Sequence, residues 1–395
     1  MALNSQPASG AARSFPAGEI RLRRLEAWAL RVAIARPVET SFGIMRDRPA
    51  VFVRVEDDRG AFGFGEIWCN FPACGAEHRV RLAIEELAPL LADRPFVAPA
   101  DAIALMWDRT RVRVLQTGEP GPYSQAIAGL DIALWDLAAR QAGLPLRRFI
   151  AEDAADAVPA YASGIHIAIA RDAVPEARAA GFRNFKVKVG FDTAADLAGL
   201  AVLRDTLQPG ERLFSDANQA WDLAGALAFT EGARGLGLGW LEEPLRADAP
   251  AADWVRLAAD GGIPLAAGEN FTGAADFDAA VAAGALTYIQ PDMAKWGGVT
   301  GCLPVARAIL AGGRTYCPHY LGGGIGLLAS AHLLAAVGGP GLLEVDANPN
   351  PLRAEIPGLA MPEGRCRLTS GSGLGVEAIP AYLMDKATLH RTWTA

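Results

Sequence analysis

Regularly spaced cysteines are absent from this chain. Its five cysteines, Cys69, Cys74, Cys302, Cys317 and Cys366, are odd in number and contain no C-x-x-C pair. A disulfide framework or a zinc knuckle needs such a pattern, so neither is indicated. We expect reduced thiols in a cytoplasmic protein.

Long apolar runs and basic runs are also lacking. No stretch reaches 18 uninterrupted apolar residues, and the most apolar late segment, 326–337, includes His332 and is too short to span a membrane. Residues 1–18 are rich in Ala, Ser, Pro and Gly and contain no signal-peptide core, so we expect a disordered leader there. The formal net charge of -7 gives no reason to expect nucleic acid as a partner.

The composition that remains suits a large folded core. The 395 residues are 51% hydrophobic and 21% charged, which is typical of globular proteins and allows two structural units. Residues 19–150 predict an α+β capping domain, because alternating strands come first and helical periodicity follows. Its expected elements are strands at 20–35, 50–56 and 61–67, irregular loops at 37–49 and 68–75, and helices at 79–91, 101–114 and 124–143.

Strands and helices alternate from residue 151 to residue 350. The expected strands are 158–164, 184–190, 212–216, 239–243, 264–269, 288–291, 314–318 and 342–345. Eight strands separated by Ala-rich helical segments predict a (β/α) TIM-type barrel. A doubly wound sheet would need a Gly-rich phosphate turn after its first strand, and none is present. Residues 351–395 lose this rhythm and predict an irregular return segment that packs on the cap.

Acidic residues end three consecutive strands of the predicted barrel. Asp216, Glu242 and Glu269 should meet, because barrel chemistry lies at the carboxyl ends of the strands. Like charges placed together need a cation. All three are oxygen donors with no His or Cys among them, which selects Mg²⁺, with Mn²⁺ as the alternative.

Candidate bases stand on either side of these acids. Lys186 and Lys188 share one face of the strand 184–190, since side chains alternate along a strand. A buried lysine is costly unless it is paired or loses its proton, so the pair suggests a lysine tuned as a base. Asp292 and His319 end the sixth and seventh strands. This set indicates proton abstraction next to a carboxylate, with the metal neutralising the enediolate that develops.

Taken together, these residues resemble the enolase superfamily, specifically its mandelate racemase subgroup. The resemblance rests on K-x-K at 186–188, the acids Asp216, Glu242 and Glu269, the triplet Gly268-Glu269-Asn270, Asp292 with His319, and Glu344. It covers nearly the whole chain, the N-terminal cap included. It implies a modified (β/α)7β barrel with a capping domain.

The resemblance also implies roles for single residues. Lys188 would be the base on one face of the substrate, and His319, oriented by Asp292, the base or acid on the other. Glu344 would hydrogen-bond the substrate carboxylate. Lys186 would lie near that carboxylate and, as a neighbouring cation, would lower the pKa of Lys188 so that it is neutral near pH 7.

Substrate choice is expected to lie in the two cap loops. Arg46 and Arg48 would bind a distal carboxylate or hydroxyl groups of the substrate. The remaining candidate substrate-binding residues are Trp68, His166, Asn218 and Lys295. The glycine run 322–326, which follows His319, would let the backbone approach the substrate. The stretch 342–353 resembles acid-sugar members of the subgroup, so we expect an aldonate or aldarate.

Several reactions remain open for this constellation. We expect dehydration or lactone cycloisomerisation of an acid sugar, ahead of racemisation or epimerisation of a 2-hydroxy acid by the same two bases. A metal-independent glycoside hydrolase would use paired carboxylates without the lysine pair. A non-catalytic sugar-acid-binding protein would be expected to lack one of the bases or ligands. The expected partner is a small carboxylate or acid sugar, with no nucleic acid or membrane, and the chain is expected to form a homo-oligomer.

Overall fold

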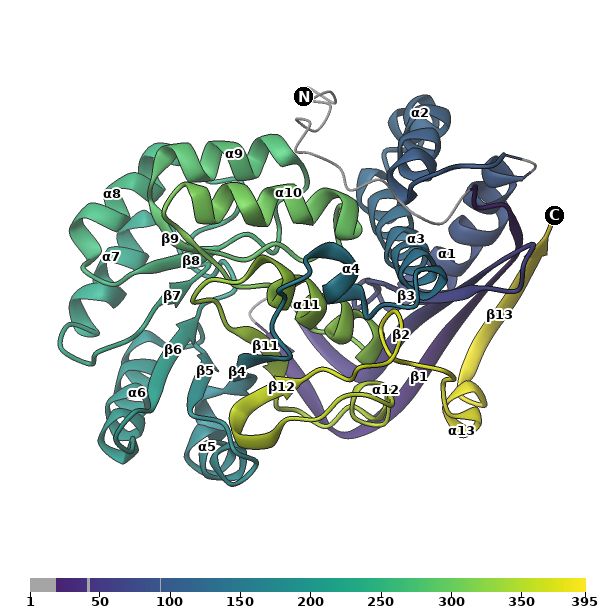
Figure 1. The fold of residues 1–395 in the computed structure, drawn as a ribbon. Coiled ribbons are helices and arrows are strands. Elements are labelled where there is room, and N and C mark those ends of the chain that lie inside the picture. The colour runs from purple at the N-terminus through teal and green to yellow at the C-terminus, as the bar shows by residue number, and fades with distance from the viewer. Residues whose placement is uncertain (1–18, 41–42, 93) are drawn as a thin grey trace.

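The computed structural model describes residues 19–40, 43–92 and 94–395 (Figure 1). The leader expected at residues 1–18 lies outside the described residues. Figure 1 shows a ring of helices around parallel strands on one side of the molecule and a smaller unit of antiparallel strands and helices on the other. The predicted architecture, a TIM-type barrel with an N-terminal cap, is confirmed.

The cap contains a four-stranded antiparallel sheet with the strand order β13-β1-β2-β3. Its strands are β1 (Leu22–Thr40), β2 (Gly43–Asp57), β3 (Phe62–Ile67) and β13 (Ala387–Thr394). The irregular loop expected at 37–49 is wrong, because β1 and β2 continue as a paired hairpin there. Pro37 favoured the incorrect prediction of a loop at this position. The ladder accommodates it through a register shift between Ala33 and Val38.

Helices pack beside this sheet, some directly on it and others on one another. They are α1 (Gly75–Arg81), the π-helical turn Leu82–Leu87, the 3-10 turn Ala88–Leu91, α2 (Pro99–Thr117), α3 (Pro120–Gln141) and α4 (Leu146–Ile150). Helix α3 lies directly on β3, and glycines make the approach possible. A Cβ atom on Gly65 would stand 2.1 Å from the carbonyl oxygen of Gly129. The helix predicted at 124–143 therefore packs directly on β3, and its residues 123–139 are all buried.

The barrel sheet contains eight parallel strands in the order β10-β9-β8-β7-β6-β5-β4-β11. They are β4 (Ala157–His166), β5 (Asn184–Lys188), β6 (Arg212–Asp216), β7 (Leu241–Glu242), β8 (Leu265–Ala267), β9 (Leu286–Ile289), β10 (Thr315–Tyr316) and β11 (Leu343–Asp346). The two ends of this series approach each other, since the backbone N–H of Leu342 lies 3.4 Å from Cys317 Sγ. All eight strands were expected from the sequence, at bounds shifted by a few residues.

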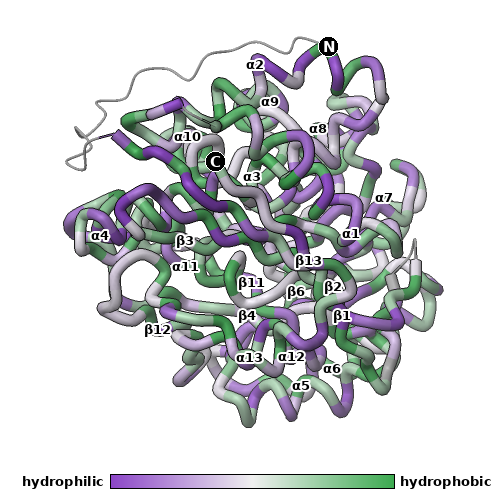
Figure 2. The backbone as a smooth tube through the Cα atoms, turned by 90° about the vertical axis from the view of Figure 1, so that its right-hand side faces the viewer, coloured by the Kyte–Doolittle hydropathy of each residue, from purple (hydrophilic) through white to green (hydrophobic). Residues whose placement is uncertain are grey.

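Helices separate the barrel strands and form its outer ring. The longer ones are α5 (Ala170–Ala179), α6 (Thr193–Thr206), α7 (Leu223–Gly232), α8 (Ala251–Gly261), α9 (Ala274–Ala283), α10 (Gly298–Ala311) and α11 (Gly324–Val337). No helix in the described part of the chain is long and apolar enough to cross a membrane. Hydrophilic and hydrophobic stretches interleave along the tube in Figure 2. All five cysteines are free thiols.

The C-terminal segment is more ordered than the sequence suggests. It holds α12 (Pro351–Ala354), a 3-10 turn (Pro362–Gly364), β12 (Arg365–Arg367), which pairs with β4, and α13 (Ala381–Met384). Strand β13 then runs antiparallel to β1 from Arg24 to Leu30 and completes the cap sheet. The expectation of an irregular segment is therefore wrong for residues 387–394. Their strand is stabilised by pairing with a distant strand, which local composition does not report.

Candidate functional site

The interior of the barrel has an apolar floor with polar residues directly above it. The floor is a buried cluster of Tyr161, Phe214, Trp240, Ala266, Cys317 and Leu342. Because successive side chains on a strand alternate, the residue two positions later points into the same interior. Four floor residues are followed in this way by Ser163, Asp216, Glu242 and Glu344, and Cys317 is followed by His319, all of them buried. The chemistry predicted for the strand ends is therefore gathered above one hydrophobic plug.

Lys186 occupies the position on β5 that Phe214 occupies on β6. It is 1% exposed and lies 5.5 Å from the Tyr161 ring centroid. Its ammonium group contacts Glu242, Glu344 at 2.8 Å and Asp216 at 3.3 Å. Burial lowers the pKa of Lys186, but the surrounding carboxylates outweigh this effect and raise it well above its ordinary value. Lys186 is thus a fixed positive charge. It lies among two predicted metal ligands, Asp216 and Glu242, and the predicted partner of the substrate carboxylate, Glu344.

Lys188 lies beside Asp216 and Asn218. Its Nζ is 2.6 Å from Asp216 Oδ2 and 2.7 Å from Asn218 Oδ1. Burial and the nearby Lys186 lower the pKa of Lys188, whereas Asp216, Glu269 and Glu242 raise it, and the net effect is upward. Lys186 thus lowers the pKa of Lys188, as expected, and the carboxylates act in the opposite direction. The carboxylates outweigh the single neighbouring ammonium group.

His319 connects the Asp292 side of the barrel to Glu269. Its Nδ1 is 2.7 Å from Asp292 Oδ2, and its Nε2 is 2.6 Å from Glu269 Oε2. Burial lowers the pKa of His319, but Glu269 and Glu344 raise it well above the ordinary value. The predicted Asp292–His319 pair is therefore formed, with the imidazole oriented by Asp292 and its other nitrogen directed at the acids.

Glu242 is held by two donors. One carboxylate oxygen, Oε2, accepts hydrogen bonds from Trp240 Nε1 at 3.1 Å and from Gln290 Nε2 at 2.7 Å. The other oxygen, Oε1, faces Lys186. Burial raises the pKa of Glu242 to about 8, and the negative charge of Asp216 adds to this effect. Because both neutral donors bind Oε2, Oε1 of Glu242 points toward Lys186 and the other acids.

Glu269 reaches the cluster because the backbone before it is glycine. Gly268 has a φ of 140°, and a Cβ atom there would lie 2.7 Å from the backbone nitrogen of Gln290. Only glycine fits both constraints. Asn270 Nδ2 bridges Glu269, at 3.1 Å, and Glu243, at 2.8 Å. The Gly268-Glu269-Asn270 triplet is thus explained by local structure: the glycine permits the backbone conformation, and the asparagine holds the glutamate.

Three residues near these strand ends show unusual backbone conformation. Asn218, Gln219 and Glu243 have φ values of 44°, 64° and 39°, which residues other than glycine rarely adopt. They lie within three residues of Asp216 or Glu242, which end their strands. Strain of this kind concentrates at functional sites, where the surrounding structure enforces it. Its position here supports the assignment of the site to these strand ends.

The acids of the cluster are oxygen donors of the kind that a divalent cation prefers. Within the described residues, no group of three His, Cys, Asp or Glu side chains stands in metal-binding geometry. The carboxylates of Asp216, Glu242 and Glu269 instead contact ammonium or imidazole groups. The chemistry of the set nonetheless fits Mg²⁺, because all three donors are carboxylate oxygens, buried in Asp216 and Glu242 and largely covered in Glu269. Asp216 and Glu242 are also in register on adjacent strands.

The candidate substrate-binding residues lie at different distances from this cluster. Lys295 Nζ is 2.8 Å from Asn270 Oδ1 and 3.6 Å from Glu269 Oε1, and it lies 5.0 Å from the Trp68 ring centroid. Lys295 therefore borders Glu269, and Trp68 borders Lys295. His166 is in register with Lys188, but its ring stacks on Phe191, and its Nδ1 accepts a hydrogen bond from the backbone of Ala168.

The two cap arginines have different surroundings. Arg46 is exposed. Arg48 is buried and contacts Asp346, which also lies 3.2 Å from Arg353. Arg48 therefore joins the cap hairpin to the end of β11, two residues beyond Glu344.

We expect Arg48→Ala to destabilise the protein and Arg46→Ala to leave stability nearly unchanged. Loss of Arg48 leaves the buried Asp346 with Arg353 alone, so the cost should lie below the roughly 3–5 kcal/mol of an isolated buried pair. The exposed Arg46 should change stability by about 0.5 kcal/mol or less. Urea denaturation of both variants measures the difference. Equal stability would show that the Arg48–Asp346 contact does not hold the cap to the barrel.

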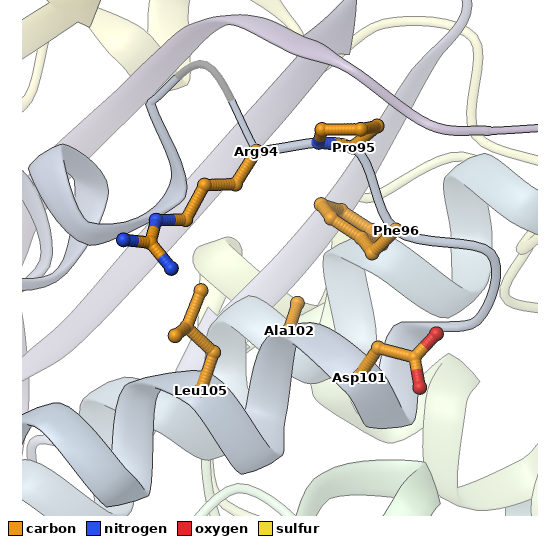
Figure 3. A pocket seen from close by; sticks show the side chains of 6 residues that line it. All are labelled: Arg94, Pro95, Phe96, Asp101, Ala102 and Leu105. Carbon is orange, nitrogen blue, oxygen red and sulfur yellow. The ribbon is translucent and has the colours of Figure 1, made fainter.

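A surface cavity lies away from the strand ends. It has a volume of roughly 280 Å³ and is lined by Arg94, Pro95, Phe96, Asp101, Ala102 and Leu105 at the start of α2 (Figure 3). The Asp101 carboxylate accepts the backbone N–H groups of Val97 and Ala98, so it serves the helix start. This cavity brings together no set of catalytic groups.

Sequence reasoning missed three residues that contact the site. Gln290 holds Glu242, Ser163 donates to Glu344 at 2.5 Å, and the backbone of Tyr320 donates to Glu344 at 3.1 Å. Two of them were detectable. Ser163 stands two positions after a floor residue, and Gln290 two positions before Asp292. The contact from Tyr320 is made by its backbone and leaves no signal in the sequence.

Comparison with known proteins identifies both parts of the chain. Residues 24–151 match the family model "Mandelate racemase / muconate lactonizing enzyme, N-terminal domain", and residues 168–381 match "Enolase C-terminal domain-like". The chain is 29% identical over 364 residues to D-galactarolactone cycloisomerase of Agrobacterium fabrum, covering 86% of this chain and 92% of that protein. It is 29% identical over 332 residues to L-talarate/galactarate dehydratase of Salmonella typhimurium, covering 82% and 80%.

Solved structures agree with this placement. A mandelate racemase/muconate lactonizing enzyme from Bordetella bronchiseptica RB50 has 52% identity and a TM-score of 0.88, with 94% of this chain and 100% of that chain covered. A racemase from Streptomyces coelicolor A3(2), solved with bound magnesium, has 28% identity and a TM-score of 0.81, with 93% and 100% covered.

Proposed function

This chain is an enzyme of the enolase superfamily, in its mandelate racemase subgroup, and from that premise we propose that it abstracts the α-proton of an acid-sugar carboxylate. The proposed outcome is loss of the oxygen on the neighbouring carbon. In dehydration that oxygen leaves as water. In lactone cycloisomerisation it belongs to the ring and stays in the molecule.

The observation that carries this proposal is the placement of two proton-transfer groups around one acidic cluster. Lys188 stands at the end of β5, and His319 follows β10, on the other side of the barrel. Both approach the acids, Lys188 through Asp216 and His319 through Glu269. A substrate carboxylate held between them would present one face to each group. One group can then remove the α-proton while the other protonates the departing oxygen.

The remaining site residues orient these groups. Asp292 holds the imidazole of His319 through Nδ1 and so directs Nε2 at the substrate. Glu344 is fixed by Ser163 and by the backbone of Tyr320, which leaves it able to hydrogen-bond a substrate oxygen. Lys186 supplies a buried positive charge for the substrate carboxylate. Asn218 positions the ammonium group of Lys188.

Asp216, Glu242 and Glu269 would hold Mg²⁺ in this enzyme. The bound cation would stabilise the negative charge that develops on the substrate carboxylate as the α-proton leaves, and it would compete with Lys186 and Lys188 for the acids. Gln290 and Trp240 support this role, because they occupy one oxygen of Glu242 and leave the other for the cation.

The substrate class is supported by the named relatives. One acts on a galactarolactone, and another on talarate and galactarate, which are all acid sugars by name. Arg46 on the cap hairpin and Lys295 beside Trp68 are cationic groups suited to the hydroxyl and carboxylate groups of such a substrate. An aldonate, an aldarate or its lactone is therefore the proposed substrate.

Incubation with a panel of aldonic, aldaric and lactone substrates in D₂O tests the proposal. We expect one or more members to exchange the α-proton for deuterium and to form a dehydrated or ring-opened product, detected by NMR and mass spectrometry. Formation of an epimer alone would assign a racemase instead. Absence of α-proton exchange in every member of the panel, with release of a sugar from a glycoside supplied in a parallel incubation, would contradict the proposed chemistry.

A further inference from the structure

Glu66, at the end of cap strand β3, reaches into the barrel. Its side chain is buried, and its carboxylate accepts the backbone N–H of Gly323 at 2.5 Å and that of Gly326 at 2.9 Å. The hydroxyl group of Tyr320 donates a third hydrogen bond to it. All three donors lie between His319 and the first turn of α11. A single cap carboxylate therefore holds the barrel segment that directly follows His319.

The same segment holds a second residue of the site. The backbone N–H of Tyr320, whose hydroxyl bonds Glu66, donates to Glu344 Oε2 at 3.1 Å. Asn350 fastens the segment from the other side by a hydrogen bond to the carbonyl of Gly322 at 3.1 Å. The position of Glu344 is thus connected to the cap through Tyr320.

These contacts explain why glycines occur in the run 322–326. A Cβ atom on Gly323 would lie 2.7 Å from Glu66 Oε1, and one on Gly326 would lie 2.2 Å from the hydroxyl oxygen of Tyr320. Neither distance accommodates a side chain. The glycines therefore allow the backbone to approach Glu66 and Tyr320 closely.

Burial of the Glu66 carboxylate costs free energy. Burial raises its pKa to about 7, against the three hydrogen bonds that lower it. A carboxylate that only filled space could be replaced by an apolar side chain at no such cost. The carboxylate of Glu66 offsets this cost by accepting three hydrogen bonds from the segment after His319.

We propose that Glu66 is a positioning residue for the reaction, fixing His319 and Glu344 from the cap through Tyr320 and the 322–326 backbone. This rests on the proposed function to the extent that His319 and Glu344 act on the substrate. Glu66 itself contacts neither His319 nor Glu344 in the hydrogen bonds of the described residues. A small displacement of catalytic groups can cost on the order of 10²-fold in rate.

Glu66→Gln tests this role against a matched control, Asp131→Asn. Asp131 is also a fully buried cap carboxylate with a pKa raised to about 7 by burial. It bonds the barrel as well, accepting the backbone N–H of Thr300 in the first turn of α10 at 2.8 Å, and not the segment that follows His319. Both substitutions replace one buried carboxylate by its amide. A purely structural role would give the two variants similar behaviour.

We expect Glu66→Gln to lower kcat by roughly 10- to 100-fold while KM and Mg²⁺ affinity change by about twofold or less. Asp131→Asn should keep the wild-type kcat. Hydrogen–deuterium exchange should rise in the peptide containing residues 319–326 of Glu66→Gln and stay unchanged there in Asp131→Asn. Tyr320→Phe, which removes one hydroxyl group and keeps the backbone bond to Glu344, should lower kcat in the same direction.

The role is overturned if wild-type kcat persists in Glu66→Gln, or if Asp131→Asn loses as much activity. If Glu66→Gln does not fold, Tyr320→Phe decides by the same kcat criterion. Inactivity of the wild-type enzyme on the acid-sugar panel would instead contradict the proposed function. In that case unchanged exchange of residues 319–326 in Glu66→Gln would still overturn the structural link.

Discussion

Lys188→Ala and His319→Asn should each lose turnover by several orders of magnitude, and they should differ in the exchange that they retain in D₂O. General acid–base catalysis by one side chain contributes about 10²–10⁴-fold, and loss of its orienting contacts adds to this. Neither residue is a proposed metal ligand. Both variants should therefore bind Mg²⁺, which isothermal titration measures independently of turnover.

The difference between the two variants follows from their positions. Lys188 and His319 face the substrate from different sides of the barrel, and the α-proton of one epimer points to only one side. The variant that keeps the abstracting base should still exchange the α-proton without forming product. The other variant should not exchange. NMR of the recovered substrate distinguishes them.

His332→Asn is the matched control for His319→Asn. His332 is fully buried in α11, and its Nδ1 accepts the backbone N–H of Arg147, away from the acids. This variant should keep turnover even if its stability falls. Exchange at the wild-type rate in both Lys188→Ala and His319→Asn would show that neither residue is the base.

Removal of divalent cations should abolish turnover, and Mg²⁺ should restore it. The expectation follows from Asp216, Glu242 and Glu269, which are three carboxylates with no His or Cys among them. Chelation with EDTA followed by addition of Mg²⁺ or Mn²⁺ measures both steps. Full activity after exhaustive chelation would exclude this mechanism and favour metal-independent chemistry such as glycoside hydrolysis.

Glu242→Gln locates the cation within the cluster. Loss of a supporting residue around a metal typically weakens binding about 10- to 100-fold, and loss of a ligand charge should cost at least as much. The fold should survive, because Gln retains an oxygen for the bonds from Trp240 and Gln290. Asp136→Asn is the control. Asp136 is a buried acid that accepts the backbone N–H of Phe64 within the cap, so Mg²⁺ affinity should be unchanged there.

Much of the barrel was predictable from the sequence, because its signals are local. Strand alternation has a period of two, so the floor residue Phe214 predicts the direction of Asp216, and Trp240 predicts that of Glu242. The carboxyl ends of parallel strands meet at one face of a barrel, which brings distant acids together without further information. The family resemblance and the pairing of Asp292 with His319 were also predicted from residues at the strand ends.

Tertiary structure alone decided how the charges are paired and how the cap is fastened. Lys188 has a raised pKa because three carboxylates surround it, a balance that depends on distances between different strands. Arg48 is buried against Asp346, although 298 positions separate them in the chain. Strand β13 is ordered by β1 at the opposite end of the sequence, and Glu66 meets the glycine run across the interface of cap and barrel. Local spacing specifies which side of an element a residue faces. The residue that it meets there is determined by the packing of distant segments.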